Sequence, residues 1–93
     1  MSDLSFVKVT KVVALAGHRL HLWFSDGTEG VRAFSDILAE GGPMVEPLND
    51  GKYFARVFLD FGAPTWPNGY DIAPYVLHAE LKSAGLLRQH AAE

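Results

Sequence analysis

A proline followed by an asparagine–glycine pair, within residues 66–71 (WPNGYD), constrains this chain more than any other stretch. Pro67 fixes its own φ and favours an extended conformation in the residue before it. Asn68 and Gly69 tolerate the backbone that ends a tight turn. The stretch therefore predicts a short strand and then a rigid corner. Its two aromatic residues are large enough to anchor that corner on a core, or to contact a partner.

The residues after the corner predict the last helix. Asp71 can accept hydrogen bonds from the backbone N–H groups that follow it, and Pro74 suits a first helical turn. Apolar residues then recur at helical spacing, which predicts a helix over residues 74–84. Gly85 suits the left-handed stop of that helix. The tail, residues 86–93, has little pattern, and we expect it to fray.

Alternating apolar residues predict antiparallel strands over most of the remaining chain. The corresponding runs are residues 6–15, 19–25, 28–33, 55–61 and 65–66. The first run changes phase near Lys11, which indicates a bulge or an early end of the strand. Asp26 and Gly27 predict a type I′ hairpin turn, in which both residues have positive φ. The first three runs therefore form an antiparallel meander, and the last two form a C-terminal hairpin.

Residues 34–41 predict a short helix, with Ser35 as its cap and Gly41 as its stop. The proline-containing segment 42–48 is expected to be extended, and residues 49–52 to form a turn. The predicted fold class is therefore α+β: a mainly antiparallel sheet with one short and one longer helix packed on it. We expect a single domain over residues 1–93, compact over about residues 5–85.

Composition limits the function classes. The 93 residues contain no cysteine, which excludes a disulfide framework and a thiolate zinc site. The N-terminus lacks the pattern of a signal peptide, and no apolar run is long enough to span a membrane, so we expect a cytoplasmic protein. Eight scattered Lys and Arg residues and a net charge of −3 argue against autonomous nucleic-acid binding.

Candidate catalytic residues are few. The four histidines fall at no metal-ligand spacing, the serines lie in no nucleophile-elbow context, and the glycines form no phosphate-binding loop. We therefore expect no enzyme activity, no metal and no cofactor. A weaker alternative is an enzyme that uses His21 or His78 together with Asp71.

Outward-facing aromatic residues predict a binding surface. Trp23 and Phe58, with aromatic residues near the corner, exceed what a small monomer needs to expose, unless the helices cover them. We therefore hypothesise a non-enzymatic protein-interaction module that forms a homodimer or binds a small protein encoded nearby. The alternative is a small-ligand-binding domain with a pocket at residues 66–71. The candidate binding residues are Trp23, Phe58, Trp66, Asn68, Tyr70, Asp71 and Tyr75.

The chain resembles a bacterial family, domain of unknown function 2442, whose members share a D-G turn and a W-P-N-G-x-D-hydrophobic-A-P ending. The resemblance covers roughly residues 6–77, with matching segments at 26–27, 34–38, 47–50, 53–54 and 66–74. It implies a compact α+β domain that acts as the non-toxic partner in small operons of toxin–antitoxin type. Some members continue into a helix-turn-helix module, for which residues 72–93 are too few. The family supplies no catalytic residues.

Overall fold

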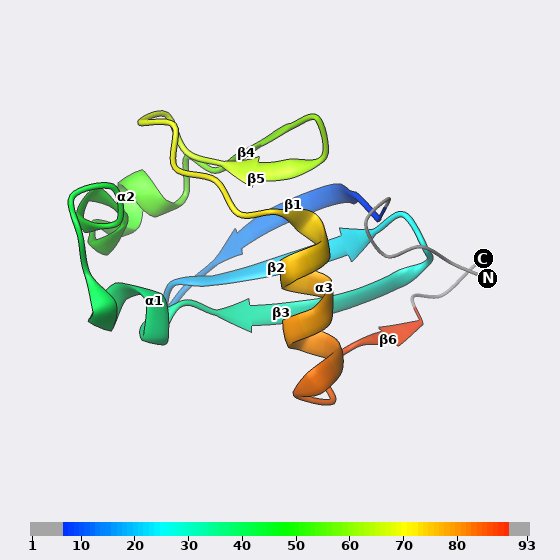
Figure 1. Cartoon of the computed structure of the whole chain (residues 1–93). Helices are drawn as coiled ribbons and strands as arrows, with labels where there is room; N and C mark the ends of the chain where they lie inside the picture. Colours follow the sequence, from blue (N-terminus) through cyan, green and yellow to red (C-terminus); the bar gives the residue numbers. More distant parts are fainter. Residues whose placement is uncertain (1–6, 90–93) are drawn as a thin grey trace.

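A four-stranded antiparallel sheet forms the body of the molecule. The last helix lies across one of its faces, and the shorter helices lie at one end of the strands (Figure 1). The computed structural model describes residues 7–89. The strand order is β1-β2-β3-β6, and a second hairpin, β4-β5, lies next to β1. The strands are β1 (Val9–Leu15), β2 (Arg19–Phe24), β3 (Thr28–Ala33), β4 (Phe58–Asp60), β5 (Ala63–Thr65) and β6 (Arg88–Gln89). The predicted α+β class is confirmed.

The phase change near Lys11 is a register shift. Val9 pairs with Phe24 and Lys11 pairs with Trp23, so one residue of β1 has no partner of its own across the ladder. A bulge of this kind moves the following side chains to the opposite face. Lys11 and Val13 consequently lie on the face of the sheet away from the core, where Val13 is 38% exposed.

The turn between β2 and β3 differs from the predicted type I′ geometry. Gly27 has a φ of 89°, whereas Asp26 does not adopt positive φ. The Gly27 N–H donates to the Phe24 carbonyl at 3.1 Å, which closes the turn. The Asp26 carboxylate accepts hydrogen bonds from the backbone N–H and the hydroxyl of Thr28. One residue with positive φ, Gly27, is enough for this turn, because the hydrogen bonds to the Asp26 side chain also stabilise it.

Four helical segments connect and cover the strands: α1 (Ser35–Glu40), the 3₁₀ helix η2 (Glu46–Asn49), α2 (Gly51–Phe54) and α3 (Pro74–Ser83). The longer predicted helix and its stop are confirmed. The Gly85 N–H donates to the Lys82 carbonyl, and the Leu86 N–H donates to the Leu81 carbonyl, with Gly85 at a φ of 73°. These two bonds define a Schellman motif.

The segment predicted to be extended and then turned contains η2 and α2 instead. Pro47 lies in the first turn of η2, where its missing N–H is not required. Asp50 caps α2, because its carboxylate accepts a hydrogen bond from the Lys52 N–H at 3.0 Å. None of the helices within residues 7–89 is long and apolar enough to cross a bilayer.

Two predicted caps are wrong. Phe34, not Ser35, occupies the N-cap position of α1, and Ala73 occupies that of α3; neither makes a side-chain cap. Asp71 instead pairs with Thr65 in an isolated β-bridge. The corner therefore continues strand β5 by a backbone pairing before the helix begins.

The predicted strand over residues 55–61 is shortened to β4. Phe61 and Gly62 form the β4–β5 turn, with φ of 52° and 81°. In a strand continued to residue 61, Phe61 would share the inward face of Leu59, but at the turn its side chain is 93% exposed. A short strand, β6, was not predicted: Arg88 pairs with Glu29, and Gln89 pairs with Thr28. The rest of the tail, residues 90–93, lies outside the described residues.

Candidate interaction surface

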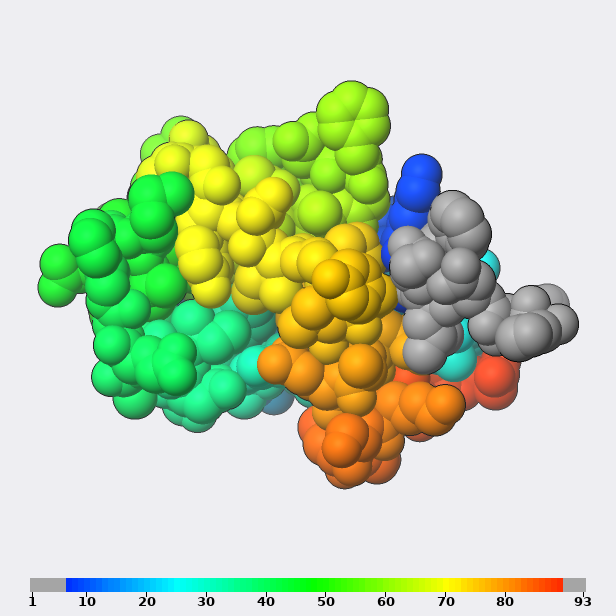
Figure 2. Space-filling view, viewed as in Figure 1, coloured from blue at the N-terminus to red at the C-terminus, as the bar shows by residue number. Residues whose placement is uncertain are grey.

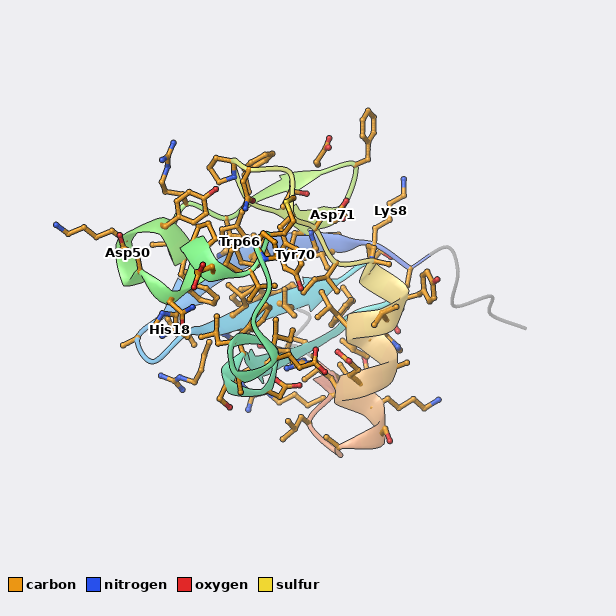
Figure 3. The ribbon with its side chains drawn as sticks, turned by 60° about the vertical axis from the view of Figure 1, so that its left-hand side comes forward. Lys8, His18, Asp50, Trp66, Tyr70 and Asp71 are labelled. Atoms are coloured by element: carbon orange, nitrogen blue, oxygen red, sulfur yellow. The ribbon has the colours of Figure 1, made fainter. Side chains whose placement is uncertain are left out.

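The corner at residues 66–71 is a structural anchor. Trp66 is completely buried, and its indole Nε1 donates a hydrogen bond to the Phe54 carbonyl at 2.9 Å. Its ring lies between 5.7 and 5.8 Å from the rings of Phe34, Phe54 and Tyr70. Trp66 and Tyr70 lie side by side in Figure 3. Trp66 therefore has no exposed surface with which to bind a partner, contrary to its place among the candidate binding residues.

The polar groups of the corner are already engaged. The Asn68 side-chain amide donates to the Met44 carbonyl at 2.9 Å, and its Oδ1 accepts from the Tyr70 N–H at 3.1 Å. The Asn68 N–H donates to the Tyr53 hydroxyl at 2.8 Å. Burial raises the pKa of the half-buried Tyr70. A groove between β3, α1 and α3 includes no corner residue. The geometry thus favours anchoring over a ligand pocket here.

One face of the main sheet faces away from the core, and we call it the open sheet face. Along β2, Leu20, Leu22 and Phe24 are buried among the residues that pack against α3, so the alternate residues point to the other side. The strand register places residues of β1, β3 and β6 beside them. The open sheet face consists of Lys11, Val13, Leu15, Arg19, His21, Trp23, Glu29, Val31, Ala33 and Arg88.

Trp23 lies at the centre of a row of contacts on this face. Its ring stacks on the His21 ring, with centroids 3.7 Å apart and planes 10° apart, and the Lys11 Nζ lies 4.8 Å from the Trp23 ring centroid. His21 Nε2 is 2.6 Å from Glu29 Oε1, and Arg88 Nη2 is 3.8 Å from the same oxygen. The row therefore crosses all four strands.

These contacts hold Trp23 in one orientation. A stacked, cation-flanked aromatic ring has lost most of its side-chain freedom before it meets another molecule, so less entropy is lost on binding. Alternation along residues 19–25 places Trp23 and His21 outward, but the sequence did not mark Lys11, Glu29 or Arg88. Their contacts depend on the register across the sheet, and Arg88 lies in a strand that alternation did not predict.

Histidine and carboxylate side chains do meet, although not in the predicted pairs. His21 contacts Glu29, and the buried His78 contacts Asp26 at 2.8 Å; Asp71 contacts neither histidine. The suggested pairing of His21 or His78 with Asp71 does not appear among these contacts. Within the described residues, no group of three or more His, Asp or Glu side chains is arranged to hold a metal ion.

The remaining candidate residues lie on other elements. Phe58 in β4 is 45% exposed, and Tyr75 near the start of α3 is 51% exposed. Trp23 belongs to the open sheet face, whereas α3 lies on the opposite side of the sheet. The seven candidate binding residues therefore do not form one surface: one lies on the open sheet face, two are exposed elsewhere, and four build the corner.

The fold and these contacts define a small α+β domain whose sheet has one face packed against a helix and one face that bears no helix within residues 7–89. The family model described as "Protein of unknown function (DUF2442)" matches residues 9–83. The chain belongs to this family, and the resemblance inferred from its motifs is confirmed. No curated protein and no solved structure matches the chain.

Proposed function

We propose that this domain is a non-enzymatic protein-interaction module that binds its partner through the open sheet face. The observation that supports this role is the row of contacts around Trp23. Aromatic residues held rigidly near the centre of a mixed apolar and charged patch are typical of binding hot spots. Val13 and Val31 lie on the same face and provide apolar surface next to the row.

The charges of this face suit a partner with acidic groups at its rim. Lys11, Arg19 and Arg88 carry positive charge, and the one carboxylate among the face residues, Glu29, already contacts His21 and Arg88. Rim charges of this kind steer association and set partner choice more than they add affinity. We further propose that the domain acts as the non-toxic partner in a toxin–antitoxin-like operon, so a protein encoded by a neighbouring gene is the first partner to test.

The experiment compares Trp23→Ala and Val13→Asp with the wild type. Each variant is co-expressed with the products of the neighbouring genes, and co-purification and the molar mass in solution are measured. Both variants should lose the complex while their thermal unfolding shows an intact fold, because neither residue belongs to the buried core. Tyr75→Ser, on the helix-bearing side, is the matched control and should keep the complex. Complexes of unchanged mass and affinity in both open-face variants would refute the proposal.

A further inference from the structure

The β4–β5 turn presents an aromatic side chain in an unfavourable backbone conformation. Phe61 has a φ of 52° and is 93% exposed. A bulky residue rarely adopts positive φ, and two-residue turns of this geometry prefer Asn, Asp or Gly at this position. Neither burial nor turn preference therefore explains a phenylalanine here. Strained, exposed residues of this kind occur at sites that bind another molecule.

The turn is held rigidly against β1. The Val9 N–H donates a hydrogen bond to the Gly62 carbonyl at 2.9 Å. Gly62 also packs closely on Lys8, so that a Cβ at Gly62 would come within 2.8 Å of the Lys8 Cβ. Figure 2 shows the yellow-green β4–β5 segment protruding from the body of the molecule. Phe61 is therefore fixed at the tip of a braced, protruding hairpin.

The same chain carries a groove of suitable size and chemistry between β3, α1 and α3. Its volume is about 710 Å³, which exceeds that of a phenyl ring. Its apolar lining comprises Ala33, Ala79, Leu81, Ala84 and Leu86. Leu86 is 53% exposed, so the groove opens to solvent beside an apolar rim. We call this surface the α1–α3 groove.

The polar side of the α1–α3 groove has a net negative charge. Arg32 is held between two carboxylates, at 2.7 Å from Asp36 and 3.1 Å from Glu80. Two carboxylates and one guanidinium leave one negative charge in excess. Lys8 packs beside the Phe61 turn and Asp60 directly precedes Phe61, so the two charges next to the tip balance. The match between the tip and the groove is therefore apolar in character.

We propose that this chain self-associates by inserting Phe61 of one copy into the α1–α3 groove of a second copy. The tip and the groove are different surfaces, so each contact joins two unlike surfaces. A closed pair forms when each copy supplies both surfaces to the other. Ala33, at the end of β3, is the one residue that the groove shares with the open sheet face. Trp23 and its row of contacts stay free for the partner proposed above, and failure of either proposal leaves the other standing.

The decisive variant is Phe61→Asn, because its effects on stability and on assembly have opposite signs. Asparagine tolerates positive φ, so the melting temperature of the monomer should rise by a few degrees. The dissociation constant for self-association, measured by analytical ultracentrifugation, should increase at least tenfold. Phe58→Asn removes another exposed aromatic residue of the same hairpin, and this control should associate like the wild type.

A second variant blocks the groove. Ala79→Trp, at an exposed position of α3, should also weaken association. Mixing Phe61→Asn with Ala79→Trp restores one intact contact, because the first variant keeps its groove and the second keeps its Phe61. The mixture should therefore associate more strongly than either variant alone. A wild type that stays monomeric up to millimolar concentration, a Phe61→Asn variant that associates normally, or a mixture no stronger than its components would each overturn the proposal.

Discussion

The indole of Trp66 donates its hydrogen bond to the backbone carbonyl of Phe54, twelve residues earlier in the chain, and both side chains are at most 2% exposed. This bond joins the corner to the end of α2, so the corner and α2 stabilise each other. Phe34, at the start of α1, completes the aromatic cluster around Trp66. The corner, the end of α2 and the start of α1 therefore meet in one buried aromatic cluster.

Replacing Trp66 with phenylalanine should be strongly destabilising. The Phe54 carbonyl would be left buried without a donor, and the smaller ring would leave a cavity, at a combined loss of about 2–4 kcal/mol in the free energy of unfolding. This loss is a large part of the stability of a small domain. Urea denaturation measures it directly. Tyr75→Phe, at a half-exposed position, is the control and should change stability by less than about 0.5 kcal/mol. Equal midpoints for the two variants would refute the anchoring role.

The packing of the end of α3 on β3 depends on the absence of a side chain at Gly30. A Cβ there would lie 2.9 Å from the Leu86 carbonyl oxygen and 3.1 Å from Leu81 Cδ1. Gly30→Ala should therefore push the Schellman turn away from the sheet and cost about 1–3 kcal/mol. Gly51→Ala is the matched control, since that glycine has negative φ and no neighbour within 4 Å of an added Cβ. It should be neutral or slightly stabilising in the same denaturation experiment.

Local patterns predicted the elements that depend on local physics. Alternation identified β2, because Leu20 and Leu22 must be buried every second residue, and Pro74 with Gly85 bounded α3 nearly to the residue. The tight turn at the corner also follows from its own residues: the Gly69 N–H donates to the Trp66 carbonyl at 2.8 Å. In each case the sequence signal and the contact lie within a few residues of each other.

Elements that depend on distant partners were missed. β6 exists because Arg88 and Gln89 pair with a strand sixty residues earlier, and two residues carry no periodicity of their own. Phe61 fitted the inward phase of alternation, but the pairing of Asp60 with Ala63 makes it a turn residue. The row around Trp23 likewise needed the register of four strands. The candidate surface was therefore predictable along β2, at Trp23 and His21, whereas its residues on the other strands were not.

Acid should weaken the contact between the β2–β3 turn and α3. Burial alone would raise the pKa of the Asp26 carboxyl, but hydrogen bonds from Thr28 and from the buried His78 outweigh it and lower that pKa below its ordinary value. A carboxyl with a depressed folded pKa adds stability that is complete above its unfolded pKa, about 3.9, and is lost as the pH falls through the folded value. Because the Asp26 side chain is 38% exposed, we expect less than about 1 kcal/mol.

The measurement is the free energy of unfolding in urea at several pH values from 7 down to 3. Asp26→Asn should be less stable than the wild type at pH 7, and the difference should shrink towards pH 3, because the variant has no carboxyl to protonate at this position. Thr28→Val keeps the carboxylate but removes the hydroxyl that donates to it at 2.6 Å, so the Asp26 pKa is less depressed. Its acid-induced loss of stability should therefore be smaller, and complete at a higher pH, than in the wild type. A stability difference between Asp26→Asn and the wild type that is the same at every pH would show that the Asp26–His78 contact does not respond to protonation of this carboxyl.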